Sequence, residues 1–266
     1  SDDVRHRCQD PSRHDDPPSM TSPTRKMPES RTPETPAPGV APAFDPRKAT
    51  VVADGPEALP AVGCDCLAAD RLRARFSNPP RWSPEMTGDR IRLHVGPPRP
   101  AAVLLPIVLH AAGPAVLLTQ RTAHLRQHSG QVAFPGGRHE PADRTPVHTA
   151  LREAHEEVGL EPSRVEVIGR LPEYLTGTGF QVTPVVGLVE PGFEVRPDPH
   201  EVAAVFEVPL EFLMDPRHHQ RRLIEVAGEQ RIFWAMPWRA HPAADEYFIW
   251  GATAAMLRNL YRLLSA

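Results

Sequence analysis

The sequence lacks the features that mark membrane, secreted and repeat proteins. No apolar run reaches the length of a membrane span, no apolar signal-peptide region stands near residue 1, and no internal repeat is present. The formal net charge is −3, which gives no reason to expect a surface for nucleic acid or another polyanion. We therefore expect a cytoplasmic protein that has neither a membrane nor a nucleic acid as its partner.

Cysteine is scarce and is confined to the first part of the chain. The three residues are Cys8, Cys64 and Cys66, and no second Cys or His pair has the spacing of a structural zinc site. Nothing predicts a disulfide framework, which agrees with a reducing cytosol.

Composition divides the chain into three parts. Residues 1–46 contain ten prolines and a single aromatic side chain, Phe44, so they cannot bury enough apolar surface to fold and are predicted to be a disordered tail. Residues 47–100 form an extension with a short basic amphipathic helix at 67–76, which is more suited to packing on the core than to binding an anion. The main domain is expected at 101–266.

Alternating runs of strand and helix character predict an α/β fold for that domain. Strands are expected at 102–109, 115–118, 131–134, 164–168, 182–189, 222–226 and 231–235. A loop with two glycines is expected at 171–180, a short helix at 208–214 and an amphipathic helix at 249–264. Strands mixed with a few helices are typical of a layered α/β domain.

The sequence around residues 145–159 predicts a helix with a defined start and end. Thr145 suits the N-cap, Pro146 suits the first helical position, and Gly159 suits the position after the last helical residue. An apolar stripe that should face the core is formed by Val147, Leu151, Ala154 and Val158.

Three carboxylates on this helix predict a metal site. Glu153, Glu156 and Glu157 stand at i, i+3 and i+4, so we expect them to share a face roughly opposite the apolar stripe. Like charges repel there, and the helix dipole disfavours the two in the last turn. A bound Mg²⁺ or Mn²⁺ reverses that argument, because these ions prefer oxygen ligands. The alternative is a solvated acidic face.

The same residues resemble a known signature. Arg152-Glu153-Ala154-x-Glu156-Glu157-x-Gly159-Leu160 is similar to the second half of the Nudix box, G-x5-E-x7-R-E-U-x-E-E-x-G-U, where U is a bulky aliphatic residue. The first half departs from the pattern, because Asp143 stands where the box has Glu and eight residues separate it from Arg152. The resemblance implies a Nudix-type α/β/α sandwich with a mixed central sheet.

The stretch before the box resembles one branch of that family. Residues 117–137 are similar to the LLT-x-R-x-x-x-LR-x-H-x-G-x-V-x-FPGG signature of the coenzyme A pyrophosphatases. The resemblance implies metal-dependent hydrolysis of the diphosphate bond of coenzyme A and its thioesters. The products would be 3′,5′-ADP and 4′-phosphopantetheine or its acyl form.

The resemblance also implies roles for individual residues. Glu153 and Glu157 would be the primary ligands of Mg²⁺ or Mn²⁺, with Glu156 as a third or water-mediated ligand. A carbonyl of Gly136 or Gly137 would complete the shell. The catalytic set implied by the box is Glu153, Arg152 and Glu156, and the general base is either a box glutamate or Glu140.

A polar segment just upstream leaves two interpretations open. Arg121, His124, Arg126 and His128 either bind the 3′-phosphate of the substrate or keep the surface solvated. Together with Gly136, the residues Arg121, Arg126 and His128 are our predicted substrate-binding set.

The function also has alternatives. One is hydrolysis of another nucleoside diphosphate derivative, such as ADP-ribose, NADH or a dinucleotide. The other is a non-catalytic nucleotide-binding module, which the intact set Arg152, Glu153, Glu156 and Glu157 argues against. The sequence leaves a homodimer open.

Overall fold

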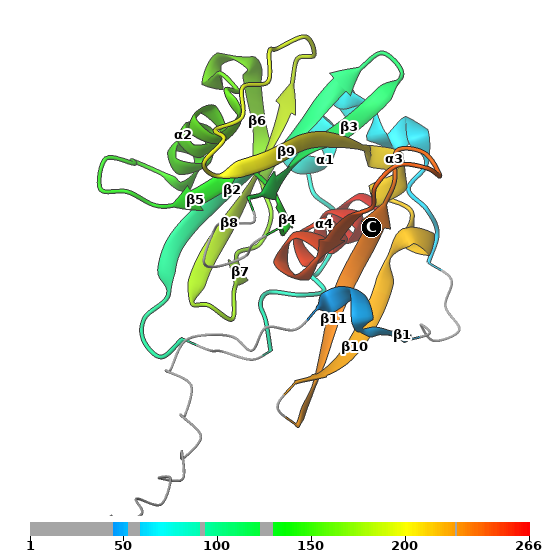
Figure 1. Cartoon of the computed structure of the whole chain (residues 1–266). Helices are drawn as coiled ribbons and strands as arrows, with labels where there is room; N and C mark the ends of the chain where they lie inside the picture. Colours follow the sequence, from blue (N-terminus) through cyan, green and yellow to red (C-terminus); the bar gives the residue numbers. More distant parts are fainter. Residues whose placement is uncertain (1–44, 53–58, 91–93, 123–129, 227) are drawn as a thin grey trace, which may run out of the picture. The chain divides into compact units, whose positions relative to one another are not determined.

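The computed structural model describes residues 45–52, 59–90, 94–122, 130–226 and 228–266 (Figure 1). All of them belong to one compact unit, Gly39–Ala266. The tail predicted at 1–46 lies outside the described residues except for its last two positions, where Asp45 caps a short 3-10 helix. Among the helices that the structure describes, none combines the length and the apolarity of a membrane-spanning segment.

The larger of two sheets is mixed and has the order β4-β3-β2-β8-β6. Its long central strands, β2 (Arg99–His110) and β8 (Phe180–Val189), are parallel, and the other pairs are antiparallel. The remaining strands of this sheet are β3 (Gly113–Arg121), β4 (Val132–Ala133), β5 (Gly136–Arg138), β6 (Val165–Arg170), β7 (Tyr174–Leu175) and β9 (Val202–Pro209). In this sheet β5 pairs with β2, β7 with β8, and β9 with β3.

Helices cover both faces of the larger sheet. Because side chains alternate along a strand, Leu104 faces the core beneath α2 (Pro146–Val158), whereas Leu105 faces the opposite core. That opposite core is shared by α1 (Ala69–Ser77), α3 (Leu210–Leu213) and α4 (Gly251–Leu264). The predicted α/β/α sandwich with a mixed central sheet is confirmed.

A second, antiparallel sheet lies against α4. Its strands, in spatial order, are β1 (Thr50–Val52), β10 (Gln220–Val226), β11 (Glu229–Trp238) and β12 (Tyr247–Trp250). Thr253 of α4 donates a hydrogen bond to the carbonyl of Val132 in β4 (3.1 Å), which ties α4 to the larger sheet. Since β1 pairs with β10 and α1 packs on β6, parts of segment 47–100 share sheet and core with the later residues.

One of the long strands was not expected, and two expected elements need correction. Strand β9 was not expected, because its run Val202–Pro209 holds two alanines and becomes a strand by pairing with β3. Val208 belongs to that strand, so the short helix begins only at Leu210. Residues 249 and 250 belong to β12, whose pairing with β11 overrides their helical periodicity. Short 3-10 helices occupy Pro46–Lys48, Cys64–Leu67, Pro162–Arg164 and Pro216–His218.

A group of polar side chains, which we call the α4 polar cluster, consists of the buried Arg258, His219 and Asn259 and of Glu85 at its edge. Arg258 donates from Nε to Glu85 (2.8 Å) and from Nη1 to Nδ1 of His219 (3.0 Å). His219 in turn donates from Nε2 to the carbonyl of Leu213 (2.7 Å), and Asn259 accepts from the backbone N–H of Glu85 (2.8 Å). Each polar group is therefore paired, and the cluster links α4 to segment 81–90 and to the start of β10.

Candidate active site

Helix α2 has the limits that its sequence predicts. Thr145 accepts a hydrogen bond at Oγ1 from the N–H of His148 (3.2 Å), and Pro146 is the first helical residue. Gly159 ends the helix with φ +73°, a conformation that glycine adopts without strain. Both predicted ends are confirmed, and they fix which side chains face the sheet.

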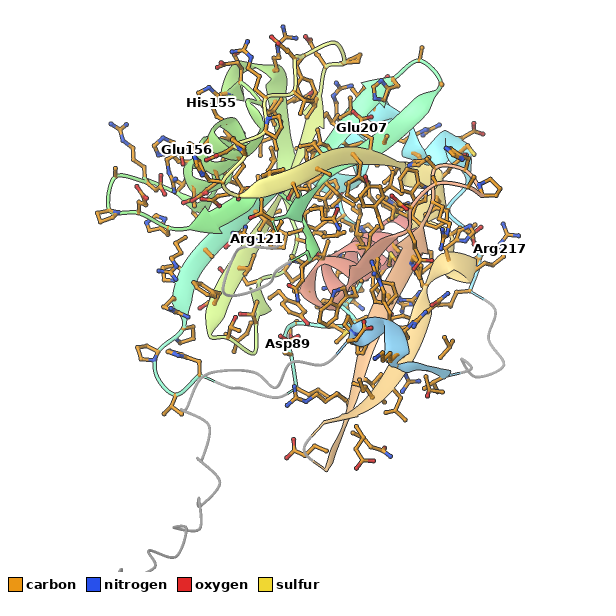
Figure 2. All side chains as sticks on the ribbon, in the orientation of Figure 1. Asp89, Arg121, His155, Glu156, Glu207 and Arg217 are labelled. Atoms are coloured by element: carbon orange, nitrogen blue, oxygen red, sulfur yellow. The ribbon has the colours of Figure 1, made fainter. Side chains whose placement is uncertain are left out.

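The three glutamates of α2 do not share one open face, which corrects our expectation. Glu157 is only 4% exposed, whereas Glu156 is exposed. At about 100° per residue, Glu157 lies only about 20° around the helix from Ala150, which is fully buried. Figure 2 shows Glu156 on the outer side of α2. The helix thus presents Glu153 and Glu157, but not Glu156, to the interior.

Two glycines bring the backbone of β5 against these two acids. The N–H of Gly136 donates to Oε2 of Glu157 (3.2 Å). A Cβ on Gly136 would overlap with the backbone of β2, and a Cβ on Gly137 would overlap with the carboxylate of Glu153. Glycine is therefore needed at both positions for the close approach.

The interior acids are held in an environment that disfavours their charge. Burial raises the pKa of Glu157 to about 7, and nearby Arg121, whose Nη1 lies 3.6 Å from Oε1 of Glu157, only partly offsets this. Burial also raises the pKa of Glu153 above its usual value, and the opposing effect of Arg152 is smaller. Two carboxylates one helical turn apart, both with raised pKa values, are a natural site for a cation.

Arg152 is held in place by Asp143, the residue that stands where the box has Glu. Asp143, which is buried, accepts hydrogen bonds from Nε (3.1 Å) and Nη2 (3.0 Å) of Arg152. These bonds hold the pKa of Asp143 well below its usual range. Thr149 donates to the same carboxylate (2.9 Å). Arg152 also contacts Glu153 (3.0 Å) and Glu156 (2.9 Å). Asp therefore reaches Arg152 despite its shorter side chain and the extra residue in the loop.

Sequence reasoning missed one acid of the site. Glu201, which directly precedes β9, lies 3.4 Å from Nη2 of Arg121, and its charge raises the pKa of both Glu153 and Glu157. No motif marks Glu201, because only the pairing of β9 with β3 brings it beside Arg121.

The structure describes two of the four predicted substrate-binding residues, Arg121 and Gly136. Arg121 lies 3.6 Å from Glu157 and lines the cavity described below, as does Gly136. The exposed Glu140, our loop candidate for the general base, lines it too. Arg126 and His128, with His124, lie outside the described residues.

A cation could be held here by few protein ligands. Within the described ranges, no three Asp, Glu, His or Cys side chains gather closely enough to hold a metal ion by themselves. The donors present are the carboxylates of Glu153 and Glu157 and the backbone of the β5 glycines, where the absence of a Cβ leaves room. Mg²⁺ commonly binds one or two carboxylates and completes its shell with water and substrate phosphate, so this donor set fits it.

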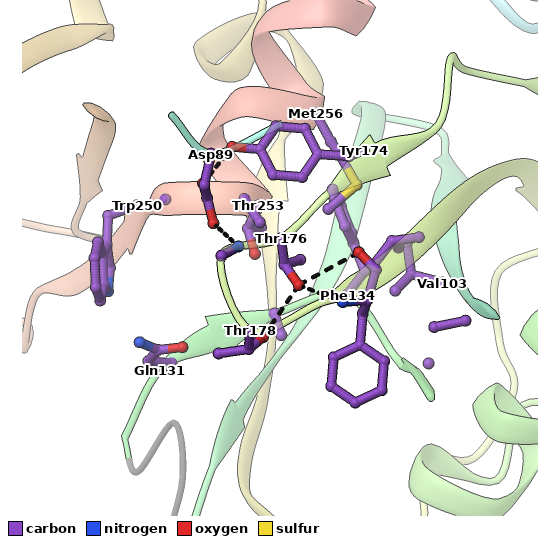
Figure 3. Close-up of a pocket in the computed structure, with 18 of the residues that line it drawn as sticks. Asp89, Val103, Gln131, Phe134, Tyr174, Thr176, Thr178, Trp250, Thr253 and Met256 are labelled. Atoms are coloured by element: carbon purple, nitrogen blue, oxygen red, sulfur yellow. Dashed lines mark hydrogen bonds between the residues drawn. The ribbon is translucent and has the colours of Figure 1, made fainter. Parts of the chain in front are cut away.

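The acid pair opens into a cavity of about 700 Å³ that spans both sheets. Glu153, Glu157 and Glu201 line one part of it, and Phe233, Trp250 and Met256 line another. Figure 3 shows Asp89 beside the loop 174–180: it accepts hydrogen bonds from the hydroxyl of Tyr174 and from the N–H of Gly177, both 2.6 Å long. The cavity has the size and the mixed lining of a site for a complete small molecule, larger than a diphosphate alone.

Known proteins resemble this chain in sequence over most of its length. A family model described as NUDIX domain matches residues 98–229. An uncharacterized Nudix hydrolase NudL from Citrobacter koseri is 44% identical over 195 residues, covering 73% of this chain and 93% of the relative. NudL from Salmonella paratyphi B is 45% identical over the same shares. Among solved structures, a Nudix hydrolase from M. smegmatis, RenU, aligns with 27% identity and a TM-score of 0.38 over 44% of this chain and 74% of that chain.

Proposed function

Since the chain belongs to the Nudix hydrolase family, and is thus a diphosphatase acting on phosphoanhydride bonds, we propose that its substrate is coenzyme A or a coenzyme A thioester. Hydrolysis would add water across the diphosphate and release two phosphomonoesters, 3′,5′-ADP and 4′-phosphopantetheine or its acyl form. The observation that carries the proposal is the buried Glu157 beside the partly buried Glu153 at one part of a cavity of about 700 Å³.

Two features support this substrate over a smaller diphosphate. The cavity continues from the acids to aromatic and apolar side chains, which suits a nucleotide joined to a long, mainly apolar chain. The stretch 117–137 carries the signature that coenzyme A pyrophosphatases share. It supplies Arg121, Gly136 and Gly137 to the site.

We assign the cation to Glu153, Glu157 and the Gly137 carbonyl, whereas Glu156, exposed on the outer side of α2, would hold Arg152 (2.9 Å). Nudix hydrolases typically use a divalent metal. When bound, Mg²⁺ or Mn²⁺ neutralises charge on the diphosphate and lowers the pKa of a water molecule.

The protein's own side chains supply the remaining functions. Asp143 fixes Arg152, which in turn orients Glu153 and neutralises part of its charge. Arg121 stands between Glu157 and Glu201, where it can contact a phosphate oxygen. Glu201 joins Glu140 and the box glutamates as a candidate to accept the proton of the attacking water. The cytoplasmic location stays a prediction from the sequence. A homodimer stays an alternative that the sequence leaves open.

The test is a substrate panel with the purified chain. Coenzyme A, acetyl-coenzyme A, ADP-ribose and NADH are each incubated with Mg²⁺, with Mn²⁺ and with chelator, and products are separated by chromatography. We expect metal-dependent release of 3′,5′-ADP from the first two and much slower cleavage of the others. Faster cleavage of ADP-ribose or NADH than of either coenzyme A compound would overturn the proposal and favour the second class of substrate.

A further inference from the structure

Arg231 of β11 is a cation whose buried donor has no partner. Its Nε is buried and forms no hydrogen bond in the described part of the chain. Its neighbour across the strand pair is Ile224, which offers no charge. A buried donor without an acceptor costs about 1–3 kcal/mol, and more when it is charged, so this position needs an explanation.

The arginine lines the same cavity as the acid pair, but it comes from the other sheet. Arg231 belongs to β11 of the second sheet, whereas Glu153 and Glu157 belong to α2, which packs on β2 and β5 of the larger sheet (Figure 1). Its neighbours along β11, Ile232 and Phe233, also line the cavity, and they lower the local dielectric. A charge in such surroundings interacts strongly with an anionic ligand.

The other cavity arginine near the acids is already engaged. Arg121 has Glu157 at 3.6 Å and Glu201 at 3.4 Å, so its charge serves the acid cluster. Arg138, at the side of β5, lies over the ring of Phe180 (5.3 Å) and is exposed. Arg231 has neither a carboxylate nor a ring contact of this kind among the described residues, which leaves its guanidinium for a ligand.

The aromatic side chains beside Arg231 indicate which half of the substrate it meets. The rings of Phe233 and Trp250 have centroids 5.5 Å apart, and both residues line the cavity. Flat ring surfaces next to a guanidinium suit a nucleobase and the phosphate of its ribose, because bases stack on aromatic rings and Arg forms paired hydrogen bonds with phosphate.

We propose that Arg231 binds a phosphomonoester on the nucleoside half of the substrate, remote from the diphosphate that is cleaved at Glu153 and Glu157. The inference rests on the proposed function for the position of that diphosphate. It names the substrate class more narrowly, as a nucleoside diphosphate derivative that carries a third phosphate. Arg231 would then be a determinant of specificity and not a catalytic residue.

The test measures binding of two probes that the enzyme cannot hydrolyse at an anhydride bond. Adenosine 3′,5′-bisphosphate and adenosine 5′-monophosphate are titrated calorimetrically into the full chain, into Arg231→Gln and into Arg231→Lys. We expect the wild type to prefer the bisphosphate by at least about tenfold, or about 1.4 kcal/mol. Arg231→Gln should lose that preference while its affinity for the monophosphate stays within about twofold. Arg231→Lys should keep part of it, because Lys retains the charge without the planar fork.

Arg221→Gln on β10 is the matched control, since Arg221 belongs to the same sheet but does not line the cavity. It should keep the full preference, and thermal melts should show that all variants are folded. Equal affinities of the wild type for the two probes, or an unchanged preference in Arg231→Gln, would overturn the proposal.

A kinetic arm separates this proposal from the proposed function. With coenzyme A and 3′-dephospho-coenzyme A as substrates, Arg231→Gln should lower kcat/KM about tenfold for the first only. If the wild type cleaves neither compound but cleaves ADP-ribose, the proposed function fails, and the binding measurement still decides the role of Arg231.

Discussion

Two buried polar clusters of this protein differ in how completely their charges are compensated. In the α4 polar cluster, Arg258 pairs with Glu85 and His219, and His219 also bonds the carbonyl of Leu213. In the acid cluster, Glu157 feels the charge of Glu153, with Arg121 and the N–H of Gly136 as partial compensation.

The difference shows which cluster serves the fold and which serves a ligand. Burial lowers the pKa of His219 to about 4, so that residue stays neutral and its bonds are complete without a ligand. Burial instead raises the pKa of Glu157 to about 7, so the acid pair gains most from a cation. We therefore expect damage to the first cluster to reduce stability and damage to the second to reduce turnover.

The largest effect should come from removing one charge of the acid pair. Glu157→Gln keeps the size of the side chain but removes a ligand charge, so turnover should fall about a hundredfold or more, the scale of losing one electrostatic element of a site. Stability should stay the same or rise, because a buried like charge is lost. The measurement is turnover against Mg²⁺ concentration, with thermal melts as a folding control.

A parallel variant and a control variant test that result. Glu153→Gln should behave as Glu157→Gln does, whereas Glu161→Gln should be nearly silent, since Glu161 is exposed and its partner His155 is exposed too. Near-normal turnover in both Glu153→Gln and Glu157→Gln would refute the metal-site interpretation.

The next effect should fall on stability alone. Arg258→Met leaves Glu85 and His219 without their partner and removes the guanidinium that lies 4.5 Å above the ring of Trp234. We expect a loss of about 2 kcal/mol in the free energy of unfolding, reduced from the usual cost of breaking a buried pair because the Glu85 side chain is 29% exposed. Urea denaturation measures it.

The control is Arg73→Met, whose partners Asp70 and Glu166 are exposed, and which should lose less than about 1 kcal/mol. Turnover per folded molecule should be unchanged in both variants. A hundredfold loss of turnover in Arg258→Met at full stability would mean that the two clusters are not separate in function.

A smaller effect should come from moving a carboxylate without removing its charge. In Gly137→Ala the new Cβ would overlap with the carboxylate of Glu153, so the acid must shift within the site. We expect about a tenfold loss of kcat/KM, equal to about 1.4 kcal/mol of transition-state stabilisation. Gly63→Ala is the control, because a Cβ there meets no atom within 4 Å and should change nothing. Equal activity of the two variants would show that Glu153 needs no fixed position.

The smallest effect concerns acid stability. Burial, Arg258 and His218 lower the pKa of His219 from 6.5 to about 4, although the Leu213 carbonyl and Asp215 act in the opposite direction. The unfolded chain therefore binds a proton at this residue more readily than the folded chain does. Stability from this residue is complete above about pH 6.5 and is lost as the pH falls towards 4. From pH 6.5 to 5.5 the loss should be about 1 kcal/mol.

Denaturation midpoints across that pH range check this prediction. The slope should flatten in His219→Gln but not in His155→Gln, whose side chain is exposed. An identical slope in the two variants would assign the acid sensitivity to other groups.

The sequence alone determined the local features of this protein. The N-cap Thr145, the end at Gly159 and the spacing of apolar residues specify α2, because capping and helix periodicity depend only on neighbouring residues. The glycines before the helix and the box residues after them indicated the acid pair and the diphosphatase family. Strands with strong apolar runs, such as Leu104–Leu109 within β2, were also readable.

Only the tertiary structure decided which side chains meet. It buried Glu157 against β5 while leaving Glu156 outside, brought Glu201 to Arg121 by pairing β9 with β3, and placed Arg231 from the second sheet in the same cavity. These relations join segments far apart in the chain. They arise from strand pairing and shared burial, which neither local propensity nor a motif encodes.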